Sequence, residues 1–263
     1  MESVLDGLNI QGSAREKGRN FADLTLHQQI MQLYGLQLSQ QSQIDTQAAA
    51  NFLRSEVFEM HVVARLRTAL LAPWLTNYVT QFQEWILNDI QCSPGAWRVE
   101  PDVTNVAEQW QHFSSELKVK TTQIRAQNKI TMYRMRAKGA DINKIAAKLA
   151  PKGMVIREHH RARLAWLMLS TVEFDELCEQ GTQKAANFWD WVGKQVLNIK
   201  SRIQEDAQYT TDLQRRTAMT QVFTRALSLH RNKFPPVSSA PPPKERPGWQ
   251  ETLEEAMKLG AVI

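Results

Sequence analysis

Apolar side chains recur at intervals of three and four residues along most of the chain, which is the spacing of helices with one buried face. One such series runs through residues 48–71 at Leu53, Val57, Met60, Ala64 and Leu71. Pro73 interrupts it, and a second series over residues 75–90 ends before the turn-forming residues 93–95. The two series predict a helical hairpin.

Three later series extend this pattern. The first occupies residues 103–117, and the last occupies residues 213–229. Between them, the apolar positions have nearly heptad spacing at Ala185, Phe188, Trp189, Val192, Val196, Ile199 and Ile203. Such a seam packs within one chain or pairs two chains in a homodimer, and the spacing leaves both open. The sequence therefore predicts a mainly α protein, a multi-helix bundle.

Only residues 161–169, RARLAWLML, could be a strand instead of a helix, and the sequence leaves this open. Residues 1–20 have no period and predict a mobile tail. Eight glutamines then lie between residues 28 and 47, around a thin apolar seam at Leu26, Ile30, Leu33 and Leu36. This pattern predicts a polar helix that needs a partner surface to be stable.

The C-terminal part of the chain changes in composition. Six of the ten prolines lie between residues 235 and 247, which predicts an extended linker over residues 233–248. In residues 249–263, Trp249, Leu253 and Met257 have the spacing of a short amphipathic helix, which docks either on its own domain or on a partner protein. The predicted regions are thus a tail (1–20), an N-terminal helical region (21–117), a basic helical segment with long packed helices (118–232), the linker and this helix.

Charge is distributed unevenly along the chain. The formal net charge is +5, but residues 118–163 contain thirteen Lys or Arg against Asp141 and Glu158, so this segment carries +11 and the remainder carries −6. Such an arrangement steers a polyanion toward one place, although a basic run is also what a solvated helix face looks like. Charge therefore favours a nucleic-acid partner without requiring one.

Several classes of chemistry lack the residues they need. Cys92 and Cys178 lie too far apart for a disulfide framework or a usual zinc motif, which favours a reducing, cytoplasmic location. The chain shows no secretory signal and no run of 18 apolar residues, so we expect no membrane partner. His159 and His160 are adjacent and point about 100° apart on a helix, which is typical of surface histidines rather than of metal ligands. Phosphate-loop, hydrolase and metalloprotease motifs are missing as well, so we expect no catalytic residue, no metal and no cofactor.

Residues 135–153, MRAKGADINKIAAKLAPKG, contain a helix end and a helix start. Gly139 can adopt the left-handed conformation that ends a helix, and Asp141 can cap the next one. That helix has a narrow apolar stripe at Ile142, Ile145, Ala146 and Leu149. Pro151 and Gly153 end it, and a third helix with three arginines can begin near Met154.

This order resembles the helix-turn-helix of resolvases and transposases, in which a glycine turn precedes a helix containing I-A-x-x-L; here the match is RAKGADINKIAAKL, within residues 134–163. That resemblance implies a third helix in the major groove of DNA. RLAWLMLSTVEFDEL, together with ADLTLHQQ near the N-terminus, resembles the AcaB-type regulators of conjugative plasmids and integrating elements. It implies a ribbon-helix-helix, in which residues 161–169 form a strand and two copies form the ribbon.

Both resemblances imply double-stranded DNA as the partner of residues 130–165. The cations that would neutralise phosphates are Arg134, Arg136, Lys138, Lys144, Lys148 and Lys152. Arg157, Arg161 and Arg163 would contact base edges, because guanidinium can bind guanine through two hydrogen bonds. Six to ten such contacts predict a loss of roughly three to five decades in affinity between 50 and 200 mM salt.

Tyr133 and Trp166 either stack on bases or belong to the core. We therefore expect a DNA-binding regulator or DNA-processing accessory factor of a mobile element. The alternative is a non-enzymatic scaffold subunit, in which tryptophan-rich helices and the basic segment bind protein or RNA.

Overall fold

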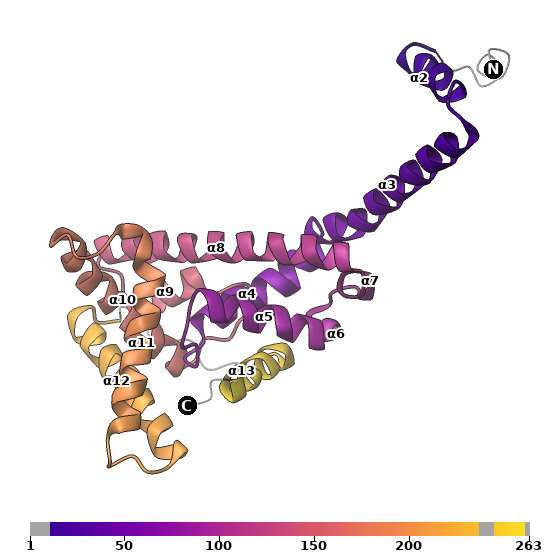
Figure 1. Ribbon diagram of the computed structural model, residues 1–263. Coiled ribbons are helices and arrows are strands. Elements are labelled where there is room, and N and C mark those ends of the chain that lie inside the picture. The colour runs from indigo at the N-terminus through magenta and orange to yellow at the C-terminus, as the bar shows by residue number, and fades with distance from the viewer. Residues whose placement is uncertain (1–10, 237–244, 261–263) are drawn as a thin grey trace.

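The computed structural model describes residues 11–236 and 245–260, and every regular element in those ranges is a helix (Figure 1). The prediction of a mainly α protein is confirmed. In chain order the elements are α2 (Ser13–Ala22), α3 (Leu26–Leu53), the π-helical turn η1 (Phe58–Val63), α4 (Ala64–Leu71), α5 (Thr80–Cys92), α6 (Pro94–Trp97), α7 (Pro101–Asn105), α8 (Ala107–Ala137), α9 (Ile142–Leu149), α10 (Glu158–Glu179), the 3-10 turn η2 (Ala185–Asn187), α11 (Phe188–Glu205), α12 (Asp212–Lys233) and α13 (Gly248–Gly260).

The N-terminal part of α3 projects away from the other helices, with α2 at its far end (Figure 1). The start of α3 is fixed by Thr25 and Gln28, whose side chains each accept a hydrogen bond from the other's backbone N–H. The predicted polar helix over residues 28–47 is thus confirmed. The prediction of a tail is wrong for residues 13–20, which belong to α2, a helix that buries no side chain. Residues 1–10 of the predicted tail lie outside the described residues.

The predicted single helix over residues 48–71 is wrong, because the chain breaks after α3. The hydroxyl of Ser55 accepts a hydrogen bond from the backbone N–H of Phe58 at 3.1 Å, as a residue that caps a new helix does. The second predicted helix begins at Thr80 rather than near residue 75, since Asn77 accepts the N–H of Val79 at 2.9 Å and holds a turn there.

Helix α10 lies at the centre of the core and packs against α12, α9, α8, α11 and α4. Residues 161–169 are part of it, so the strand alternative is wrong. Their burial explains the ambiguous pattern: of these nine residues only Trp166 and Leu169 are not fully buried, and a helix covered on all sides has no polar face to mark its period.

The heptad-like seam of α11 also faces the interior of the chain. Phe188, Trp189, Val192, Val196 and Ile203 are all buried against other parts of the same molecule. Of the two alternatives, packing within the chain is therefore the one observed, and this seam is not available to pair two copies.

Candidate functional site

The turn between α8 and α9 has the predicted local geometry. Gly139 adopts a left-handed conformation with φ of 60°, and its N–H donates to the carbonyl of Arg136 at 2.9 Å. Asp141 caps α9 by accepting hydrogen bonds from the backbone N–H groups of Asn143 and Lys144 at 2.9 and 3.2 Å. The apolar stripe of α9 is buried, as predicted.

The third helix of the expected module is not free to enter a DNA groove. It begins at Glu158 rather than near Met154, and its first three turns are mostly buried. Arg163 is fully buried: its Nε donates to the Tyr78 hydroxyl at 2.9 Å, and its Nη2 donates to the Leu75 carbonyl at 2.6 Å. The expectation that Arg163 contacts base edges is wrong, because its donors are directed into the core.

The side chain of Arg161 is likewise held by a neighbouring residue, whereas Arg157 is engaged through its backbone. Arg161 is 8% exposed, and its Nε donates to the side-chain oxygen of Asn143 at 2.9 Å, so its expected contact with base edges is also wrong. Arg157 is half-buried at the start of α10, where its backbone N–H donates to Nδ1 of His160 at 3.1 Å. The two arginines inside α10, Arg161 and Arg163, are therefore used in the packing of the protein.

Arg136, one of the expected phosphate contacts, is paired within the protein. Its guanidinium forms an ion pair with Asp175 and donates to the Thr171 hydroxyl at 2.9 Å. Tyr133 also donates to Asp175, at 2.7 Å, and Trp166 packs edge-on against Phe223 with ring centroids 5.6 Å apart. Trp166 therefore packs against the core, and Tyr133 is partly buried.

Five of the nine expected DNA contacts remain exposed to solvent: Arg134, Lys138, Lys144, Lys148 and Lys152. They lie on the last turn of α8, on α9 and in the turn that follows α9. Lys144 is 3.7 Å from the Asp141 carboxylate. Within the described ranges, no hydrogen bond or ion pair engages the side chains of the other four. Residues 134–152 thus present a cluster of cations at one end of α8, which we call the basic cluster.

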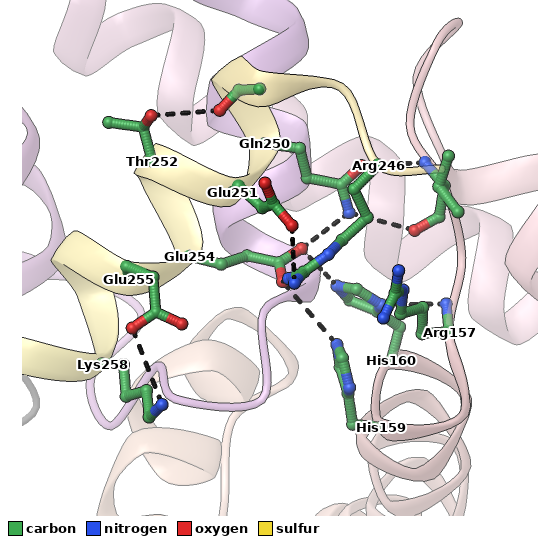
Figure 2. A network of polar contacts seen from close by, with 12 residues as sticks. Arg157, His159, His160, Arg246, Gln250, Glu251, Thr252, Glu254, Glu255 and Lys258 are labelled. Carbon is green, nitrogen blue, oxygen red and sulfur yellow. Dashed lines mark hydrogen bonds and ion pairs between the residues drawn. The ribbon is translucent and has the colours of Figure 1, made fainter. Parts of the chain in front are cut away.

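A buried polar network, which sequence reasoning missed, joins α10 to α13 (Figure 2). The carboxylate of Glu254 accepts hydrogen bonds from Gln250 at 2.6 Å and from Arg246 at 2.8 Å. Nε2 of His160 lies 3.1 Å from one oxygen of this carboxylate, and Nε2 of His159 lies 3.8 Å from the other. Residues so distant in the sequence give no local signal of this contact.

Contacts and burial in this network lower the pKa values of Glu254 and His159. Burial would raise the pKa of Glu254, but hydrogen bonds from His160 and Gln250 outweigh it and lower that pKa to about 2. Burial, together with the adjacent His160, lowers the pKa of His159 to about 4. The interpretation of both residues as surface histidines is wrong, since His160 is 3% exposed and His159 is half-buried.

This arrangement also does not make a good metal site, although His159, His160 and Glu254 offer ligand atoms within 4.8 Å of one another. Nδ1 of His160 accepts the Arg157 N–H, so the proton of a neutral ring is on Nε2, where a metal would have to bind. Arg246 also already neutralises the carboxylate. The network instead holds α13 in place.

Helix α13 docks on its own chain. Leu253 and Met257 are 4% and 5% exposed, and Trp249 packs against the same core. Gln250 adds two hydrogen bonds with the backbone of Val155, at 2.9 and 3.0 Å. Of the two alternatives for Trp249, Leu253 and Met257, docking on their own chain is therefore the one observed. Half of the predicted linker, residues 237–244, lies outside the described residues.

Comparison of the chain with protein-family models, with curated proteins and with solved structures found no match. Among the helices of the described residues, none combines the length and the apolar character needed to cross a membrane. What the protein does must accordingly be argued from its own geometry.

Proposed function

We propose that the protein binds double-stranded DNA without catalysing a reaction, and that the basic cluster makes the contact. The observation that carries this proposal is the exposure of five cations within residues 134–152, four of them without an ion pair in the described part of the chain. Unpaired Lys and Arg side chains release counterions when they meet phosphates, which is the main source of sequence-independent affinity. The narrower proposal, a regulator or DNA-processing accessory factor of a mobile element, rests on the two sequence resemblances.

The burial of α10 bears on how selectively the protein would bind DNA. Phosphate contacts position a protein on DNA but carry no base information, and two of the three arginines expected to read bases, Arg161 and Arg163, are held in the core. We therefore expect weak sequence preference from a single chain. Five phosphate contacts correspond to a salt slope of about −4.5, or a loss of roughly 500-fold in affinity between 50 and 200 mM salt.

An electrophoretic mobility titration against a random duplex tests the proposal. The variant Lys144→Glu/Lys148→Glu should lose most of its affinity at low salt and keep its melting temperature, because both side chains are exposed. Lys118→Glu is the matched control: it lies on α8, 16 residues or about 24 Å along the helix from Arg134, and should bind as the wild type does. Equal binding by all three proteins would refute the role of the basic cluster.

A second candidate function, assembly with other copies of the chain, is favoured by α3. Its large apolar side chains are mostly solvent-exposed; those more than half exposed are Leu26, Ile30, Met31, Leu33, Tyr34, Leu36 and Leu38. A soluble monomer rarely leaves so much contiguous apolar surface uncovered. Residues 26–44 also contain no Asp, Glu, Lys or Arg, so two identical helices can pair without repulsion between like charges.

Sedimentation equilibrium separates this candidate from a monomeric DNA-binding protein. Ile30→Glu/Leu33→Glu should convert an oligomer to a monomer without loss of fold, since neither residue packs on the core. Gln37→Glu, which adds a charge to the same helix without removing an apolar contact, is the control. A wild-type protein that sediments as a monomer at all concentrations would refute assembly through α3.

A further inference from the structure

A cavity of about 360 Å³ is lined by residues of α13 and of the segment from α4 to α6. Figure 1 shows α13 beside this segment. Its lining includes Arg65 from α4, Asp89 from α5, Trp97 from α6, Arg98 and Trp249 from α13. This volume is within the range of small-molecule sites, and the lining combines aromatic rings with a few charged groups, as such sites do. The cavity is separate from the basic cluster and shares none of its residues.

The guanidinium of Arg65 lacks polar partners although it is half-buried. It lies over the rings of Trp97 and Trp249, with centroids 5.5 and 5.8 Å away. Among the described residues, no hydrogen bond or ion pair reaches it. A guanidinium carries five N–H donors, and no acceptor in the described residues takes those of Arg65, so it has unused capacity to bind an acceptor.

Arg98, which is exposed to solvent, also lines this cavity and has an unusual backbone conformation. It is the only non-glycine residue of the described ranges with positive φ, at φ 55° and ψ 33°. Side-chain-bearing residues rarely adopt this left-handed region, and such strain is often found at functional sites. No hydrogen bond or ion pair from the described residues engages its guanidinium either.

The charges around the cavity do not balance. Asp89 is the acid that lines it, and one oxygen of its carboxylate accepts the indole N–H of Trp97 at 2.8 Å. Repulsion from Arg98 contributes, after burial, to lowering the pKa of Arg65, and Asp89 offsets this only in part. Burial and the same two arginines lower the pKa of His61 as well. The cavity therefore has the positive potential that attracts an anion.

We propose that this cavity binds the phosphate group of a small phosphorylated ligand, with Arg65 and Arg98 as its two charged donors. Planar guanidinium groups bind phosphate through paired hydrogen bonds, and a phosphate dianion matches two cations better than a single carboxylate does. One phosphate fills only part of the cavity, and the remaining volume beside Trp249 accommodates the organic part. The site thus adds a small-molecule function to the proposed DNA binding and does not depend on it.

Isothermal titration calorimetry of the full chain with inorganic phosphate, with adenosine monophosphate and with acetate tests the proposal. The wild type should bind both phosphates more tightly than acetate. Arg65→Gln should weaken phosphate binding about tenfold or more, the loss expected for one charge-assisted hydrogen bond. Arg67→Gln, on the same helix but outside the cavity lining, should bind as the wild type does.

Arg98→Gly keeps the proposal testable if Arg65→Gln fails to fold. Glycine adopts positive φ without strain, so this variant should be at least as stable as the wild type while it loses phosphate affinity. Any of three results would overturn the proposal: no heat of binding with either phosphate, equal affinity for acetate, or unchanged affinity in Arg98→Gly. A loss of duplex DNA affinity in Arg98→Gly without small-anion binding would assign these arginines to a DNA surface instead.

Discussion

Replacement of Arg163 by alanine distinguishes a core arginine from a DNA contact. The side chain is fully buried, and its guanidinium lies over the rings of Phe223, Trp166 and Tyr78 at 4.5, 4.9 and 5.4 Å. Alanine would remove these contacts and both of its hydrogen bonds. It would also leave a cavity and an unpaired carbonyl at Leu75.

The size of the effect follows from opposing terms. A large-to-alanine cavity costs about 2–5 kcal/mol, and an orphaned buried acceptor adds about 1–3 kcal/mol. Part of this loss, several kcal/mol, is offset because the variant no longer has to desolvate a buried positive charge. We expect a net loss of about 3 kcal/mol, which corresponds to a fall of roughly 6–12 °C in melting temperature for a chain of this size.

Thermal denaturation followed by far-UV circular dichroism measures this shift, alongside a DNA titration at low salt. Lys148→Ala is the matched control, because it removes an exposed cation and should change stability by less than about 0.5 kcal/mol. If Arg163→Ala kept the wild-type melting temperature and lost DNA affinity while the control did not, the assignment of Arg163 to the core would be wrong.

Three further changes have defined outcomes. Because the pKa of His159 is about 4 in the folded protein against an ordinary value of 6.5, the unfolded chain binds this proton first. The free energy of unfolding should therefore fall as the pH drops from 6.5 to 4, by at most about 3 kcal/mol, and urea titrations of His159→Gln should show a flatter dependence on pH. Asp141→Ala removes the cap of α9 and should cost about 1 kcal/mol in the same urea assay; no change would mean that the cap contributes nothing. Leu253→Ala opens a cavity under α13 and should weaken the packing of this helix by about 2–5 kcal/mol. Limited proteolysis followed by mass spectrometry should then show faster cleavage within residues 245–260. Unchanged protection would contradict the docked position of α13.

Features set by near neighbours along the chain were predictable. The turn at Gly139, the cap at Asp141 and the buried stripe of α9 depend on residues within a few positions of one another, and all are present. The polar helix with a thin apolar seam at the start of α3 was equally predictable, because the spacing of its residues belongs to a single helix.

Features set by distant residues were not predictable. Arginines are mostly exposed in proteins, so a basic helix is interpreted as surface unless its partners are known. The partners of Arg163 come from the loop near Tyr78 and from Phe223 on α12, and neither segment carries a signal of this contact. Glu254 and His160 meet in the same way, across a proline-rich segment of the sequence.

The lack of Asp, Glu, Lys and Arg in residues 26–44 of α3 has a practical consequence for purification. Electrostatic attachment to nucleic acid weakens as ionic strength rises, whereas apolar association is maintained or strengthened by salts such as sulfate. A wash at high salt should therefore strip bound polynucleotide from the protein and leave any self-association through residues 26–38 intact, so that the two activities can be studied one at a time.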